Sequence, residues 1–260
     1  MTDCLNFGNP QDPEMFYDFV QSVKGLSEAA KQLWYKESPL TPVPFISGNV
    51  SFYNENDSGT SIDPSPIVCA VGVIKDVSKS ITIGLKECNS LLLLFGKRKN
   101  ELGGSVYYSL HDQLGKNIPE LNFISIRGNI YSILDCVDNR LLLSCHDISD
   151  GGLFTAISEM VIKSNNGIGA ELDLNINLSP IKLLFSETPG FIAEIKKETL
   201  EKVEKVCKTH NTHFEIIGKT VKHELGDEEL IIRQFRGEIT RLKKKKMIAA
   251  WEFGLDEALL

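Results

Sequence analysis

Two polar segments, each bordering an apolar run, constrain this chain more than any other feature. The first, DCLNFGNP, begins at Asp3, and the second, GNVSFYNE, begins at Gly48. Gly48 has no Cβ, so the backbone there can come close to a bulky ligand. Asp3 and Asn49 carry the hard oxygens that Mg²⁺ accepts alongside phosphate oxygens, and Ser51 carries a hydroxyl that donates or accepts. The two segments therefore predict a magnesium–nucleotide site.

Length and charge narrow the class of protein. At 260 residues the chain is long enough to bury a sizeable core, and this length favours two compact domains over one. The formal net charge of −7 argues against a general nucleic-acid binder. The basic run at residues 243–246 is interpreted as a solvated turn or helix end.

The cysteines and apolar runs indicate a reduced, soluble protein. The six cysteines show no C-x-x-C spacing, which disfavours a zinc or redox motif and a disulfide framework. The longest apolar run, residues 91–95, is far too short to cross a bilayer, and no signal peptide opens the sequence. We therefore expect a cytoplasmic protein with neither a membrane nor a nucleic-acid partner.

Helix and strand signals alternate along the chain. Asp12 followed by Pro13 is typical of a helix start, and apolar residues at helical spacing extend this helix to about residue 35. From residues 83–86 onward the pattern is that of α/β layers, with further apolar segments at 181–184, 191–195 and 214–217. The other expected elements are strands at 44–47, 67–77, 91–95, 141–145, 228–232 and 238–242, helices at 104–114, 151–164, 200–209 and 248–260, and a mobile loop at 52–66.

A third motif, HDISDGG, begins at His146, follows an apolar strand and opens a helix. Backbone amides at a helix start can hold an anion, and two glycines permit its close approach. The alternative is structural, because Ser149 or Asp150 as the N-cap explains much of the pattern. The sequence identifies no partner for His146, so it is interpreted as a satisfied strand-end histidine and not as a general base. The candidate phosphate-binding residues are Asp147, Asp150, Gly151 and Gly152.

These motifs resemble a known family. The segments that begin at Asp3 and Gly48 are similar to the second half of the large subunit of phosphoribosylformylglycinamidine synthase, a purine-biosynthesis ligase of the aminoimidazole-ribonucleotide-synthetase-like superfamily. Three further segments agree in order: ELGGS at Glu101, HDISDGG at His146 and LFSE at Leu184. The resemblance extends over most of the chain, to roughly residue 220.

The resemblance implies a mixed α+β and α/β fold. Residues 1–84 would form part of an ATP- and Mg²⁺-binding domain of the N-type, a partial ferredoxin-like domain that contributes to a shared β-barrel. Residues 85–260 would form a C-type α/β layered domain. The stretch near residues 35–42 is longer than the family usually carries and is expected to bulge from the surface, where extra length costs little closure entropy.

Roles follow from the same resemblance, position by position. Asp3 and Gly48 would bind ATP, Asn49 would bind Mg²⁺ and Ser51 would contact the substrate. The implied reaction is amidation: ATP activates the amide oxygen of formylglycinamide ribonucleotide, and ammonia displaces phosphate to give formylglycinamidine ribonucleotide. No residue of this half is expected to be catalytic, because the catalytic histidines of the family lie in the first half.

The resemblance also implies partners. They are the missing N-terminal half of the synthase, on the same or a separate polypeptide, a glutaminase subunit or domain that supplies ammonia, and a small accessory subunit. Residues 1–84 alone would leave strand edges unpaired. Two alternatives stay open. One is another enzyme of the superfamily, although such enzymes lack the paired motifs. The other is a non-catalytic nucleotide-binding half or assembly module.

Overall fold

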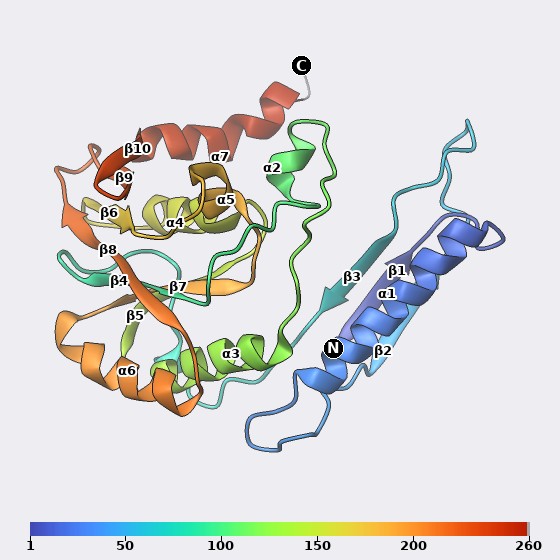
Figure 1. Cartoon of the computed structure of the whole chain (residues 1–260), viewed down its shortest axis with the longest axis horizontal. Coiled ribbons are helices and arrows are strands. Elements are labelled where there is room, and N and C mark those ends of the chain that lie inside the picture. Colours follow the sequence, from blue (N-terminus) through green and yellow to red (C-terminus); the bar gives the residue numbers. More distant parts are fainter. Residues whose placement is uncertain (259–260) are drawn as a thin grey trace. The chain divides into compact units, whose positions relative to one another are not determined.

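The computed structural model describes residues 1–258, and it describes side chains to residue 254. Its helices and strands form two compact units, and the boundary between them falls between Lys75 and Asp76 (Figure 1). The assignment of residues 1–84 and 85–260 to an N-type and a C-type domain stays a prediction.

The first unit contains a three-stranded sheet. Strand β1 (Thr2–Asn6) lies in the middle. Strand β2 (Ser47–Ser51) runs parallel to it on one side, and β3 (Ser65–Cys69) runs antiparallel on the other. Strand β2 is therefore an edge strand of this sheet.

Helix α1 (Pro13–Gln32) begins where the sequence predicts. The Asp12 side chain caps it by accepting a hydrogen bond from the backbone N–H of the second helical residue at 2.9 Å. Aromatic packing fixes the helix to the loops that follow β1 and β2. The ring of Phe19 meets Phe7 and Phe52 edge-on, with centroids 5.4 and 5.2 Å apart.

The Gly48 motif is itself a strand, so the strand expected at residues 44–47 is wrong. The ladder runs from Thr2 opposite Ser47 to Asn6 opposite Ser51, and residues 44–46 form no strand. Strand β3 is also shorter than the expected 67–77, because its partner β1 offers five residues for pairing. Beyond its end, the side chain of Val73 is 93% exposed.

The second unit is built on a seven-stranded mixed sheet in the order β10-β9-β6-β8-β4-β7-β5. Neighbouring strands are antiparallel except for β6 and β9. Strand β4 lies inside the sheet, as its continuous apolar sequence predicts for a strand covered on both faces. The strands are β4 (Leu91–Phe95), β5 (Leu142–Ile148), β6 (Ile168–Leu174), β7 (Gly190–Ile195), β8 (Phe214–Lys222), β9 (Glu229–Gln234) and β10 (Gly237–Lys243).

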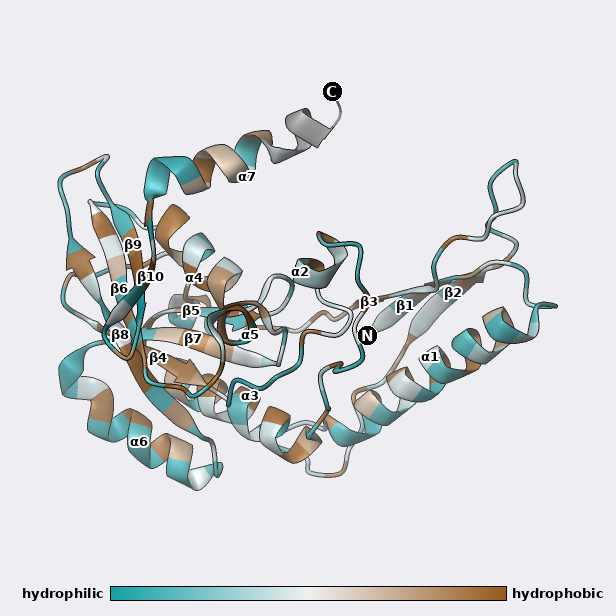
Figure 2. Cartoon of the chain, turned by 45° about the horizontal axis from the view of Figure 1, so that its top comes forward, coloured by the Kyte–Doolittle hydropathy of each residue, from teal (hydrophilic) through white to brown (hydrophobic). Residues whose placement is uncertain are grey.

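Helices cover both faces of this sheet (Figure 1). Alternation along β4 sends Leu92 and Leu94 into one core and Leu93 and Phe95 into the other. Figure 2 shows apolar residues concentrated on the strands and polar residues along α6. Helices α3 (Phe123–Asp138) and α6 (Leu200–Thr209) lie on one face, and α4 (Gly152–Ile162), α5 (Pro180–Phe185) and α7 (Lys244–Ala258) lie on the other.

The mixed α/β architecture is confirmed, with differences in individual elements. Helix α2 (Val106–Ser109) is much shorter than the expected 104–114, and the chain turns through positive φ at Asp112 and Gly115. Strand β6 is absent from the elements expected from the sequence. The basic run at residues 243–246 crosses from the end of β10 into the start of α7. The last two residues of the expected C-terminal helix lie outside the described residues.

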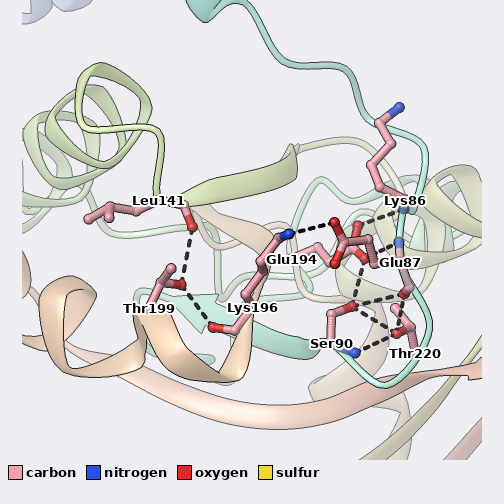
Figure 3. A network of polar contacts seen from close by, with 8 residues as sticks. All are labelled: Lys86, Glu87, Ser90, Leu141, Glu194, Lys196, Thr199 and Thr220. Carbon is pink, nitrogen blue, oxygen red and sulfur yellow. Dashed lines mark hydrogen bonds and ion pairs between the residues drawn. The ribbon is translucent and has the colours of Figure 1, made fainter.

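A fully buried carboxylate anchors the segment that precedes β4 (Figure 3). Glu194 of β7 accepts hydrogen bonds from the backbone N–H groups of Lys86 and Glu87 at 2.8 and 3.0 Å. It also accepts bonds from the hydroxyls of Ser90 and Ser144 at 2.6 and 2.9 Å. Four donors thus offset the cost of burying this charge.

Candidate functional site

The two motifs of the first unit meet on adjacent strands. Asp3 of β1 lies directly opposite Gly48 of β2. A Cβ at position 48 would overlap the Oδ1 atom of Asp3, so the carboxylate lies across the bare backbone of the glycine. Because β2 is an edge strand, the absent side chain leaves Asp3 able to reach a ligand at that edge.

The other two predicted residues lie on the opposite face of the sheet. Asn49 is opposite Cys4, and Ser51 is opposite Asn6, so alternation places Asn49 and Ser51 together and apart from Asp3. The Ser51 hydroxyl donates to Asn54 Oδ1 at 3.0 Å. A ligand that reaches all of the predicted residues must therefore straddle the β2 edge.

The residues present could supply only a few of the ligands that Mg²⁺ needs. Among the described residues, no group of three or more His, Cys, Asp and Glu side chains is placed to hold a metal ion. The amide oxygen of Asn49 fits one ligand position. Mg²⁺ commonly takes few protein ligands and completes its shell with phosphate oxygens and water.

A polar cluster in the second unit joins the three other motifs. The Glu187 carboxylate accepts, through one oxygen, the backbone N–H groups of Gly151 and Val106, each at 2.9 Å. Gly151 belongs to the HDISDGG motif, and Val106 follows the ELGGS motif. The Gly151 amide that was predicted to hold an anion is thus bound to a carboxylate of the protein itself.

The start of α4 differs from the expected helix cap. Its N-cap is Gly151, at a φ of 75°, and no side chain caps the helix there, so Ser149 and Asp150 do not fill that role. Gly152 has a φ of 69°, and a Cβ there would lie 2.7 Å from the carbonyl oxygens of Leu184 and Ser186. Close packing of two backbone segments therefore requires the second glycine.

The two acidic residues of the HDISDGG motif are both exposed. Asp147 lies on β5 with a side chain 60% exposed, and Asp150 is exposed in the turn before α4. His146 is held by two carboxylates: Nε2 lies 2.5 Å from Glu159 and Nδ1 lies 3.2 Å from Asp147. Its interpretation as a satisfied histidine is confirmed.

Arg98 and Glu101 form a buried part of this cluster that sequence reasoning did not identify. The Arg98 guanidinium donates to the carbonyl oxygens of Thr188, at 2.7 Å, and Ser186. Burial lowers the pKa of Arg98 to about 10, although the nearby Glu101 opposes this shift. Glu101 accepts a hydrogen bond from the Thr188 hydroxyl at 2.7 Å. These bonds fasten the loop after β4 to the loop before β7.

Comparison with known protein families identifies the second unit. Residues 89–229 match the family model described as AIR synthase related protein, C-terminal domain. This chain belongs to that family. The match covers the whole cluster around Arg98, Gly151 and Glu187, so those residues are features of an AIR synthase-related C-terminal domain in this chain.

Relatives of this AIR synthase-related chain share one name. The chain is 40% identical over all 260 residues to the phosphoribosylformylglycinamidine synthase subunit PurL of Methanothrix thermoacetophila. It spans about a third of the length of that relative. A solved structure of Thermotoga maritima PurL complexed with FGAR aligns with a TM-score of 0.70 at 11% identity, covering 95% of this chain and 39% of that one. T. maritima PurL complexed with ATP aligns at 0.65 and 12%, covering 95% and 37%.

At these identities the solved structures establish a shared fold and nothing further. None of the described helices is both long and apolar enough to span a membrane.

Proposed function

We propose that this chain is the C-terminal third of an ATP-dependent ligase that amidates formylglycinamide ribonucleotide to formylglycinamidine ribonucleotide, with release of ADP and phosphate. The observation that carries the proposal is the 40% identity to a synthase subunit along the entire chain. The names of two solved relatives, which record complexes with ATP and with FGAR, support the choice of ligand classes.

In this proposal the first unit binds and orients the nucleotide. Asp3 and Gly48 contact ATP at the β2 edge, where the missing Cβ lets the carboxylate and the backbone approach together. Asn49 supplies one ligand to Mg²⁺, and Ser51 contacts the substrate from the same sheet face. Bound Mg²⁺ neutralises phosphate charge. The residues of this chain then contribute positioning and not covalent chemistry.

The anion-binding role of the HDISDGG loop is part of the proposal, with a condition. Asp147 and Asp150 carry negative charge that repels an anion, so the backbone at Gly151 and Gly152 is the better candidate for phosphate. Glu187 already accepts the Gly151 amide. An incoming phosphate must therefore displace or share that carboxylate.

The partner of the first unit is the remaining, N-terminal part of the synthase. Ile67 and Val68 of β3 are 60% and 40% exposed, and Val71 is 85% exposed. Apolar strand surface of this kind favours pairing with further chain, and a shared barrel would cover it. A glutaminase and a small accessory subunit complete the proposed assembly in the cytoplasm.

A chimera tests the site. The matching third of the Methanothrix subunit is replaced by this chain, and amidation is driven by ammonium, ATP, Mg²⁺ and formylglycinamide ribonucleotide. Asn49→Ala should lower the amidation rate by about tenfold or more, because a lost metal ligand weakens charge neutralisation. Asn100→Ala, an exposed residue of the other unit, is the matched control.

The same experiment separates the catalytic proposal from a structural nucleotide site. Unchanged amidation in the Asn49→Ala chimera would contradict the proposed role. Stoichiometric nucleotide that stays bound through many turnovers, with no dependence of the rate on Asn49, would favour the non-catalytic binding module instead.

A further inference from the structure

A cavity of about 510 Å³ lies in the second unit and contains none of the residues assigned above to ATP, magnesium, substrate or anion binding. It forms at Gly96, the residue after the end of β4, beside the first two turns of α3 and the residues that lead into β7. This size falls within the roughly 300–1,000 Å³ typical of pockets for small organic ligands.

Basic side chains line this cavity in excess of acidic ones. Lys97 and Lys99 face it, while Arg98 between them points into the protein. Lys97 is exposed and has no carboxylate partner among the described residues. Lys99 lies 3.4 Å from Glu101, and the exposed Glu120 is the acidic residue of the lining. The free charge of Lys97 therefore favours an anionic ligand.

A buried amide in the same lining lacks a partner. Asn129 of α3 is 6% exposed, and its side chain makes no hydrogen bond within the described part of the chain. Its Nδ2 would lie 2.9 Å from a Cβ at position 96, where Gly96 has a φ of 91°. The Asn129 amide is not among the unpartnered polar atoms sealed from solvent, so it is open to the cavity, where a ligand can accept a hydrogen bond from it.

The orientation of α3 adds to this preference. The cavity reaches Ser125 and Ile126 in the first turn, next to the N-cap Asn122. The N-terminal end of a helix carries partial positive charge, and the Ser125 hydroxyl is a further donor.

We propose that this cavity binds the phosphate group of a small phosphorylated metabolite. Lys97 supplies charge, and the Asn129 amide and Ser125 hydroxyl donate hydrogen bonds to the phosphate oxygens. The volume exceeds that of inorganic phosphate, so the rest of the ligand is an organic group such as a sugar. The inference does not depend on the proposed amidation, because every residue that carries it lies outside the first unit.

Calorimetric titration of the full 260-residue chain with ribose 5-phosphate tests this site, with ribose as the uncharged probe. Ribose 5-phosphate should bind at least about tenfold more tightly than ribose. Lys97→Ala and Asn129→Asp should each weaken it by about fivefold or more, the second by placing a carboxylate against the phosphate. Lys202→Ala on the exposed face of α6 removes the same charge elsewhere and should change nothing.

A second readout does not depend on the variants being folded. In the wild-type chain, ribose 5-phosphate should shift the NMR signals of the Asn129 side-chain amide, and ribose should not. Equal binding of the two sugars would overturn the proposal. So would unchanged affinity in Lys97→Ala, equal weakening by Lys202→Ala, or a silent Asn129 amide.

Discussion

Gly48 shows how a missing side chain shapes a site at the scale of one residue. The atom that a Cβ would strike is the carboxylate oxygen of Asp3, which ends a short, movable side chain. At Gly152, by contrast, a Cβ would meet two backbone carbonyl oxygens at 2.7 Å, and φ is 69°. In the proposed function Gly48 therefore serves a ligand site, whereas Gly152 serves packing.

Alanine at these two positions should have opposite effects. Gly48→Ala should change the free energy of unfolding by less than about 1 kcal/mol, since Asp3 can rotate away, yet weaken ATP binding to the chimera by about tenfold. Gly152→Ala should cost about 2–4 kcal/mol, because neither backbone segment can yield. Urea unfolding and nucleotide titration measure the two quantities. Loss of stability in Gly48→Ala with unchanged ATP affinity would contradict the assignment.

The buried Glu194 carries a second prediction at this scale. Glu194→Gln replaces one acceptor oxygen by an NH₂ group that faces the N–H and hydroxyl donors now bound there. Leaving buried donors unpaired should lower the free energy of unfolding by about 2–4 kcal/mol, measured by urea titration. Glu198→Gln, at an exposed position nearby, should change it by less than about 0.5 kcal/mol. Equal effects of the two variants would rule out the network as an anchor.

At the scale of elements, α3 and α6 enclose two thiols against the sheet. Cys136 of α3 is fully buried and Cys207 of α6 is 2% exposed. Burial raises the pKa of the Cys136 thiol to about 12 and that of Cys207 to about 11. The folded chain therefore keeps these protons at pH values where the unfolded chain, with thiols near pKa 8.5, has lost them.

This difference predicts a loss of stability in alkali. Because the folded state binds more protons, the free energy of unfolding should fall as pH rises from about 8 to about 10, by about 1–2 kcal/mol for each thiol. Cys136→Ala should make this fall correspondingly smaller, and the exposed Cys88→Ala should not. Urea titrations at the two pH values give the slopes. A wild-type stability that does not decline would contradict the placement of these thiols.

The same scale shows what the sequence can reveal. Strand β4 matches its expected bounds, because a continuous apolar run with polar ends admits few alternatives. The observed β2 begins where the strand expected at residues 44–47 ends, since pairing with β1 overrides the weak strand preference of glycine and asparagine. Contacts between residues far apart in the sequence also determine the polar cluster of the second unit. The sequence around Glu187 does not predict that its carboxylate accepts hydrogen bonds from the amides of Val106 and Gly151.

At the scale of the whole molecule, the exposed apolar surface of β3 is the observation that supports the proposed partner. Ile67→Lys should leave the stability of the isolated chain nearly unchanged, because this side chain is 60% exposed. It should abolish association with the N-terminal two thirds of the synthase, measured by analytical ultracentrifugation. Leu225→Lys, in an exposed loop of the second unit, is the control. Association that survives Ile67→Lys would place the partner elsewhere.

The measurement that tests the account most directly is the product formed by the unmutated chimera described above. With ammonium, ATP, Mg²⁺ and formylglycinamide ribonucleotide, the account predicts formylglycinamidine ribonucleotide and ADP in equal amounts, and no product when this chain is omitted. A folded chimera that binds ATP and forms no amidine, while the parental Methanothrix subunit does, would contradict it.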